Sequence, residues 1–148
     1  MLAYVDSSVL GRAYLPDEPG SDEALALLDG ETRLVTGVLT RIEVTGLLVR
    51  AHRAGRVVGG LHDALDVLAD DLGHLGRVTV VRAPDSEAVE AAALEIVREN
   101  GIRALDALHI AVAETVLPLL GEPGEPLGFA SRDTDQAAAA NARGLTVT

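Results

Sequence analysis

Near its start the chain carries the sequence LAYVD (residues 2–6), a short apolar run that ends in an acid. Brief runs of similar character recur at residues 33–36, 77–81, 127–131 and 145–147. Longer segments with helical spacing separate or follow them, at residues 22–28, 38–53, 58–75, 86–99, 105–117 and 134–142. Short strands that alternate with helices predict an α/β fold, in which a central, mostly parallel sheet of about five strands is flanked by helices.

Composition favours a single domain over residues 1–148, because 48% of the residues are hydrophobic and can bury a continuous core. The segment 118–126, rich in proline and glycine, is interpreted as a surface loop and not as a domain linker. Without cysteine, any metal must be bound by oxygen or imidazole. The absence of a basic leader and of a membrane-spanning apolar run favours a cytoplasmic protein with no membrane contact.

The net charge of −11 argues against nucleic-acid binding, because an acidic surface repels a phosphate backbone. All 12 basic residues are arginine, however, so local patches that bind phosphate in a bidentate manner are still possible. The acidic excess also suits a basic protein partner. Charge alone therefore leaves both kinds of partner open.

Two acids follow predicted strands: Asp6 closes the first, and Asp133 comes just after the strand at residues 127–131. In a parallel sheet, the carboxyl ends of the strands face the crevice where ligands bind. The simpler interpretation of either residue is an N-cap for the turn or helix that follows it. Two such acids in one sheet nevertheless favour a shared site.

A third acid, Asp106, lies inside the strongly apolar helical segment RALDALHIA (residues 103–111) and shares a face with apolar neighbours. Acids are rarely buried without a partner. Asp106 therefore either forms a structural ion pair with Arg103 or His109, or belongs to a functional site.

A fourth acid, Glu43, lies in the helical segment TRIEV (residues 40–44), where apolar residues surround it. It could instead pair with Arg41 or Arg50 on a solvated face. If the four acids converge, they repel one another unless cations lie between them, so convergence implies a metal. Oxygen ligands suit Mg²⁺ or Mn²⁺, which serve phosphodiester hydrolysis in sites of this kind.

Four segments, in this order and spacing, resemble the PIN-domain ribonucleases, and specifically the VapC-type toxins of bacterial VapBC toxin-antitoxin pairs. They are VDSSVL (residues 5–10), TRIEV (40–44), RALDALHIA (103–111) and ASRD (130–133). The later Ala139, Ala140 and Gly144 extend the match, so that it covers nearly the whole chain.

The resemblance implies a PIN-like three-layer sandwich and an endoribonuclease that hydrolyses RNA. Its Mg²⁺ or Mn²⁺ site would consist of Asp6, Glu43, Asp106 and Asp133. The family also implies a homodimer and a cognate VapB-like antitoxin that blocks the site.

Positions next to the four acids are expected to support the site. Ser8 matches the hydroxyl that the family places beside the first acid, where it could orient a carboxylate or water or be a secondary metal ligand. Ser131 stands where threonine is commoner. Asp135 could be a secondary ligand, but a first-turn acid that complements the helix dipole is the preferred interpretation. His109 is expected to orient another group or to pack, and not to bind metal.

Two other functions fit parts of this pattern. A magnesium-dependent phosphatase would also place aspartates at strand ends, but those families rely on a lysine and the chain has none. The alternative is a catalytically inactive PIN-fold protein that only binds a partner. Loss of one of the four acids would support it, and none is lost.

Overall fold

A five-stranded parallel sheet forms the centre of the computed structural model, which describes residues 1–57 and 59–148. The strands lie in the order β3-β2-β1-β4-β5. Their bounds are β1 Leu2–Val5, β2 Arg33–Gly37, β3 Val78–Val81, β4 Leu127–Ala130 and β5 Thr146–Val147. The predicted α/β class is therefore confirmed, and the strand bounds differ by no more than one residue from those expected.

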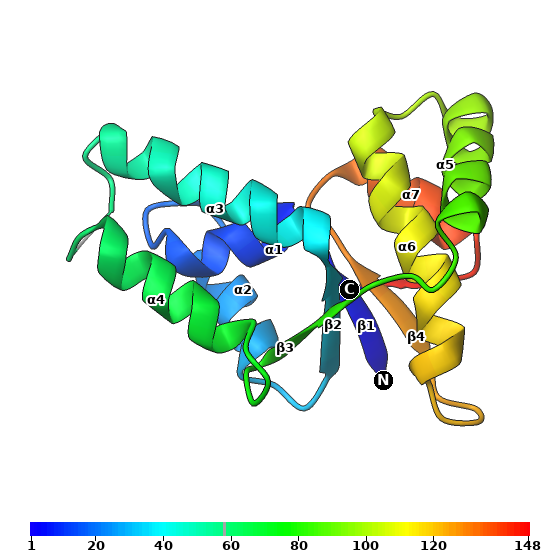
Figure 1. Ribbon diagram of the computed structural model, residues 1–148, viewed down its shortest axis with the longest axis horizontal. Coiled ribbons are helices and arrows are strands. Elements are labelled where there is room, and N and C mark those ends of the chain that lie inside the picture. Colours follow the sequence, from blue (N-terminus) through cyan, green and yellow to red (C-terminus); the bar gives the residue numbers. More distant parts are fainter. Residues whose placement is uncertain (58) are drawn as a thin grey trace.

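Helices cover both faces of the sheet and complete a three-layer sandwich (Figure 1). One layer contains α1 Ser7–Leu10, the 3-10 helix η1 Gly11–Tyr14, α2 Ser21–Leu28, α3 Val38–Arg53 and α4 Leu61–Asp71. The other contains α5 Ser86–Asn100, α6 Ala104–Leu120 and α7 Thr134–Ala142. Within the described ranges, none of these helices is both long and apolar enough to cross a membrane.

The alternating side chains of β1 divide the core in two, because successive residues of a strand point to opposite faces. Leu2 and Tyr4 pack against the layer of α5, α6 and α7, and the Tyr4 ring stacks on Phe129 of β4 with centroids 5.5 Å apart. Ala3 and Val5 pack against the layer of α1 to α4. The sheet thus separates two hydrophobic cores.

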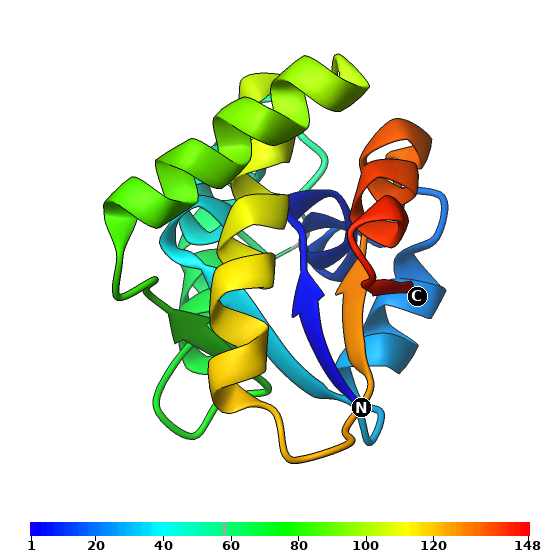
Figure 2. The ribbon, with the colours of Figure 1, turned by 90° about the vertical axis from the view of Figure 1, so that its right-hand side faces the viewer.

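The carboxyl ends of β1 and β4 lie level with each other at the middle of the sheet (Figure 2). Val5 pairs with Ala130, and the backbone N–H of Asp6 donates to the carbonyl of Ala130 at 3.0 Å. The two strands therefore deliver the segments that begin α1 and α7 to the same edge.

Helix α4 is shorter than the helix predicted over residues 58–75. The first residue of that prediction, Val58, lies outside the described residues. Gly59 and Gly60 have φ values of 85° and 125°, which a right-handed helix does not allow. After Asp71 the chain makes tight turns, in which the N–H of Gly73 bonds the carbonyl of Asp70.

Helix α6 is longer than the predicted 105–117 and includes Pro118, which the sequence pattern places in the loop at 118–126. Proline removes only one hydrogen-bond donor from a helix, and Pro118 lies in the last turn of α6. The N–H of Gly121 still bonds the carbonyl of Leu117 at 2.9 Å, so the helix continues to Leu120.

A polar cluster around Asp71 joins the end of α4 to η1 and to the start of β3. Arg77 donates to both carboxylate oxygens of Asp71 at 2.7 Å, and the Tyr14 hydroxyl donates to it at 2.9 Å. Burial would raise the pKa of Asp71, but the hydrogen bonds from Arg77 and Tyr14 outweigh it and lower that pKa below its usual value.

We predict that Asp71→Asn lowers the free energy of unfolding by about 1.5 to 3 kcal/mol at neutral pH, since a charged hydrogen-bond acceptor is lost. A carboxylate whose pKa is lower in the folded state stabilises the protein above its unfolded pKa. That contribution disappears as the pH falls from about 4 through the folded pKa. Denaturant unfolding between pH 2 and pH 7 should therefore show the difference between the two proteins narrowing in acid.

The matched control is Asp70→Asn, which removes an exposed acid one residue earlier on the same helix. It should change the unfolding free energy little at any pH. If the difference in unfolding free energy between wild type and Asp71→Asn is constant with pH, the loss of stability comes from packing and not from the charged hydrogen bonds.

Candidate active site

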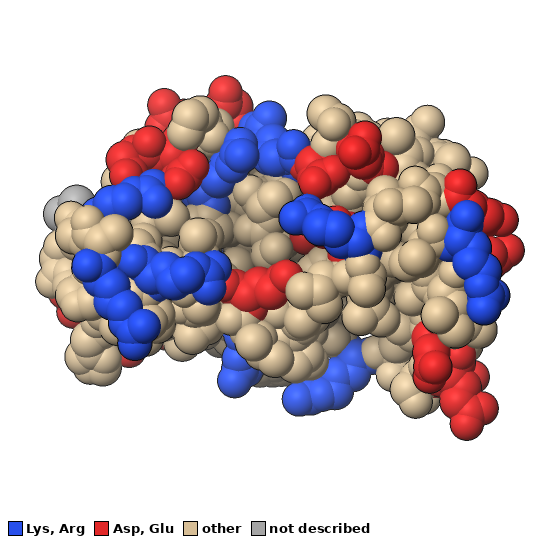
Figure 3. Space-filling view, turned by 90° about the horizontal axis from the view of Figure 1, so that it is seen from above, with Lys and Arg blue, Asp and Glu red and all other residues tan. Residues whose placement is uncertain are grey.

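The carboxyl edge of the sheet carries a hollow between the two helical layers, with acidic side chains in it and arginine side chains around it (Figure 3). A cavity of about 480 Å³ opens there. It is lined by all four of the predicted acids, which are Asp6, Glu43, Asp106 and Asp133. The structure thus brings together residues that are far apart in the sequence.

Asp6 is 4% exposed and is held at the point where β1 ends and α1 begins. Its carboxylate accepts a hydrogen bond from the backbone N–H of Ser8 at 3.2 Å, so it caps α1 as the simpler interpretation expected. The hydroxyls of Ser7 and Ser131 approach the same carboxylate at 3.4 Å and 3.5 Å. Capping orients Asp6 and leaves it on the cavity wall.

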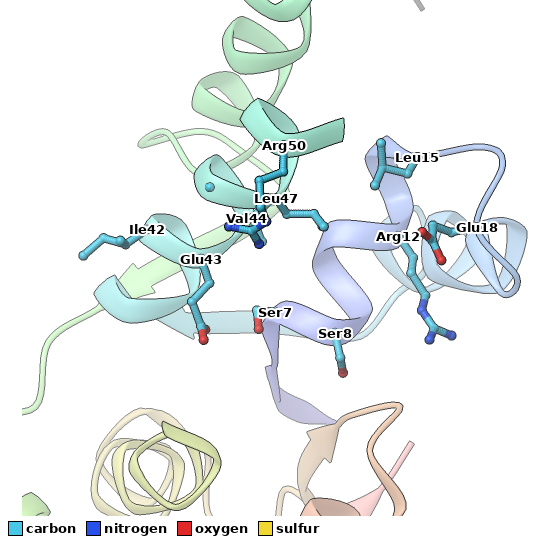
Figure 4. A pocket seen from close by; sticks show the side chains of 11 residues that line it. Ser7, Ser8, Arg12, Leu15, Glu18, Ile42, Glu43, Val44, Leu47 and Arg50 are labelled. Carbon is cyan, nitrogen blue, oxygen red and sulfur yellow. The ribbon is translucent and has the colours of Figure 1, made fainter. Parts of the chain in front are cut away.

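Glu43 reaches the cavity from the first half of α3 and points toward the opposite helical layer (Figure 4). Its Oε2 lies 2.7 Å from Nε2 of His109, a residue of α6. The alternative pairing with Arg41 or Arg50 does not occur among the residues that the structure describes. Glu43 is therefore oriented by a histidine from across the sheet.

His109 is 1% exposed and connects the acids to the centre of the sheet. Its Nε2 lies 3.5 Å from Asp6 Oδ1 and its Nδ1 lies 2.9 Å from the hydroxyl of Tyr4, which accepts the N–H of Gly37 at 3.0 Å. Burial raises the pKa of Tyr4 to about 12, so its hydroxyl keeps the proton that it can donate to Nδ1. Nε2–H then donates to Glu43.

Asp106 and Asp133 form the other half of the site, because Arg103 bridges them. Arg103 Nε lies 2.6 Å from Asp106 Oδ2, and its Nη2 lies 3.1 Å from Asp133 Oδ2. The hydrogen bond to Asp106, which is the larger cause, and the nearby carboxylates raise the pKa of the guanidinium. The predicted alternative of an Arg103–Asp106 ion pair is therefore present within the candidate site.

The turn between β4 and α7 fixes Asp133. Its Oδ1 caps α7 by accepting the N–H groups of Asp135 and Gln136, both at 3.0 Å. The Ser131 hydroxyl accepts the N–H of Asp133 at 3.0 Å and donates to Gln136 at 2.6 Å. Gln136 in turn donates to the carbonyl of Asp106 at 3.2 Å, so this turn is tied to α6.

The remaining predicted residues take supporting positions. The Ser8 hydroxyl lines the cavity and accepts the backbone N–H of Arg132 at 3.0 Å. Asp135 lies exposed in the first turn of α7 and, within the described part of the chain, is not among the residues that line the cavity. Its position fits the preferred interpretation of a first-turn acid.

The chemistry of the donor set fits a divalent cation. Ligand atoms of Asp6, Glu43 and His109 lie within 4.8 Å of one another. The two carboxylates are the groups that can bind a cation here, because His109 Nε2 carries the proton that it donates to Glu43. Oxygen-rich sites suit Mg²⁺ and Mn²⁺. Asp106 and Asp133 line the same cavity, but Arg103 occupies the space between them.

Sequence reasoning missed two contacts that organise this site, those of Arg103 with Asp133 and of His109 with Glu43. They join segments 30 and 66 residues apart, and no local pattern indicates them. The Arg103–Asp106 contact, by comparison, follows from a spacing of three residues at the start of a helix.

Comparison with known proteins gives a family and a fold. Residues 3–117 match the model of the PIN domain family, which is more than half of the chain. No curated protein matches the chain.

Solved structures with a similar fold include three from different organisms. PAE2754 from Pyrobaculum aerophilum is 20% identical, with a TM-score of 0.63 over 99% of this chain and 83% of that one. VapBC2 from Rickettsia felis, bound to a DNA fragment from their promoter, is 12% identical, with a TM-score of 0.63 over 100% and 98%. FitAcB from Neisseria gonorrhoeae is 21% identical, with a TM-score of 0.52 over 98% and 95%.

We predict that Arg103→Ala binds Mn²⁺ more tightly than the wild type, by about two- to fivefold, because the guanidinium competes with the cation for Asp106 and Asp133. Isothermal titration calorimetry measures the affinity. Arg98→Ala, which removes an exposed arginine on α5, is the control for the change in net charge. Weaker binding by Arg103→Ala would show that Arg103 orders the two acids for the metal and does not compete with it.

Proposed function

The chain belongs to the PIN-domain family, and we propose that it is a divalent-metal-dependent endoribonuclease, the toxin of a type II toxin-antitoxin pair. The observation that supports this activity best is the convergence of four carboxylates on one cavity at the carboxyl edge of the sheet. RNA is proposed as the substrate because the sequence resembles those of VapC-type toxins.

In this proposal Asp6 and Glu43 hold Mg²⁺ or Mn²⁺, and Asp106 and Asp133 complete the site when Arg103 moves aside. When bound, the cation supplies charge stabilisation and an activated water for phosphodiester hydrolysis. His109 keeps the carboxylate of Glu43 in place through Nε2–H, and the capping N–H of Ser8 does the same for Asp6.

A groove beside the site suits the antitoxin. It has a volume of about 650 Å³, lies between α1, η1 and α3, and shares Ser7, Ser8, Arg12 and Glu43 with the acidic cavity (Figure 4). Ile42, which is 63% exposed, is among the apolar residues that line it. An amphipathic helix of an antitoxin would bury these residues and direct a basic side chain at the acids.

Two solved structures of the same fold, VapBC2 and FitAcB, support a partner of this kind. We propose that the toxin itself forms a homodimer, as the family resemblance implies. The alternative of a catalytically inactive PIN protein that only binds a partner draws support from Arg103, which engages two of the four acids in the structure. Cleavage assays separate the two functions.

Asp6→Asn, Asp106→Asn, Asp133→Asn and Glu43→Gln should each abolish RNA cleavage and leave the fold intact, because each removes charge from the metal site and little packing. The assay is cleavage of a panel of cellular RNAs with and without Mn²⁺. Asp135→Asn is the control and should keep substantial activity, since Asp135 lies outside the cavity. Loss of activity in the control would give Asp135 a metal-binding role.

Inhibition by the antitoxin should weaken as Mn²⁺ rises, because a basic side chain and the cation compete for the same carboxylates. The measurement is the antitoxin concentration for half inhibition at increasing Mn²⁺, repeated with that basic residue changed to alanine. If neither the rise in Mn²⁺ nor the alanine substitution changes the inhibitory potency of the antitoxin, the partner covers the site without entering it.

A further inference from the structure

Arg12 of η1 and Arg132 of the β4–α7 turn lie side by side on the wall of the acidic cavity. Arg12 Nη1 is 3.3 Å, and Arg132 Nη2 is 3.5 Å, from the point that a Cβ on Gly20 would occupy. We propose that these two guanidinium groups form a clamp for a phosphate of the RNA strand, next to the phosphodiester at the acids. The clamp rests on the proposed function.

The charge of this pair is not compensated by a carboxylate. Five arginines form ion pairs among the described residues: Arg33, Arg56, Arg77, Arg103 and Arg143. Within residues 1–57 and 59–148, Arg12 and Arg132 form none. The acids of the loop between η1 and α2 are Asp17 and Glu18, and both bind Arg56, at 2.6 Å and 2.5 Å. A cationic spot thus persists on a chain with a net charge of −11.

The guanidinium of Arg12 and the backbone of Arg132 are held in place by hydrogen bonds. Arg12 Nη1 donates to the carbonyl of Pro19 at 2.9 Å, and the backbone N–H of Arg132 donates to Ser8 Oγ at 3.0 Å. Gly20 has a φ of 85°, in the left-handed region that favours glycine, and a side chain there would point at both guanidinium groups. The glycine therefore keeps the space between the two arginines open.

Phosphate is the ligand that this chemistry fits. Guanidinium groups bind phosphate oxygens through paired hydrogen bonds, and two of them can hold a single phosphate. A cavity with acids on one part of its wall and two free arginines on another orients a strand: one phosphodiester meets the cation held by the acids, and a neighbouring phosphate meets the arginines. Local charge at the site then overcomes the repulsion by the acidic surface.

An acidic peptide is the competing ligand for two arginines. The phosphate backbone is favoured because the pair lines the same cavity as the four proposed catalytic acids, where the proposed substrate has to enter. The direct test is binding of a single-stranded RNA to the Asp6→Asn variant in Mg²⁺, where the RNA is expected to stay intact.

Adding Arg12→Ala and Arg132→Ala to that Asp6→Asn background should weaken RNA binding by tenfold or more. It should also reduce the slope of log affinity against log salt by about 1.4, because each arginine that no longer neutralises the strand removes about 0.7 from the slope. Arg53→Ala with Arg98→Ala changes the net charge equally at exposed positions away from the cavity, and should have a much smaller effect. Arg132→Ala alone, whose side chain makes no hydrogen bond within the described residues, serves if the double variant is unstable.

The clamp variant carries Arg12→Ala and Arg132→Ala, and the control variant carries Arg53→Ala and Arg98→Ala. Equal losses of RNA affinity in the two variants would overturn the clamp. So would displacement of the RNA by polyglutamate at a matched concentration of negative charge, because the pair would then accept any acidic chain. A selective loss of RNA binding in the clamp variant supports the clamp even if the wild-type protein cuts no RNA, and in that case the proposed nuclease function fails alone.

Discussion

Mutual repulsion among the carboxylates of Asp6, Glu43, Asp106 and Asp133 is the constraint that the rest of this structure has to meet. On the buried side of the cavity, a hydrogen bond from His109 Nε2 to Glu43 reduces the repulsion between the carboxylates. On the exposed side, the Arg103 guanidinium reduces it by pairing with Asp106 and Asp133. Each acid is also fixed by the element on which it lies. Asp6 and Asp133 cap helices, and Glu43 and Asp106 project from helices that the core holds in place.

The sheet sets the orientation of this site through a chain of hydrogen bonds. Gly37 N–H donates to the Tyr4 hydroxyl, Tyr4 contacts His109 Nδ1, and His109 Nε2 contacts Glu43. Tyr4 lies on the central strand and stacks on Phe129, so it cannot shift without disturbing the core. The position of Glu43 therefore depends on the middle of the sheet as much as on α3.

Local patterns were sufficient to predict the strands, because apolar runs are visible within a few residues. They also singled out the four acids as candidates, two after predicted strands and two inside apolar helical segments. They failed where the structure depends on backbone conformation or on contacts between segments that are distant in the sequence. The positive φ angles at Gly59 and Gly60 delay the start of α4, and the anchored C-terminal turn carries α6 past Pro118. The proximity of Arg12 to Arg132 arises from the pairing of β1 with β4 and has no signature in the sequence.

The division of the hydrophobic interior by the sheet has a consequence for how the molecule unfolds. Glu43 belongs to the layer of α1 to α4, whereas Asp106 and Asp133 belong to the opposite layer, and Asp6 lies at the end of the strand between them. A cation shared by these residues would add a further link between the two layers, which the sheet and the Glu43–His109 hydrogen bond already connect. Subglobal opening of either layer would then require release of the ion, so the occupied site would make the two halves melt as one cooperative unit.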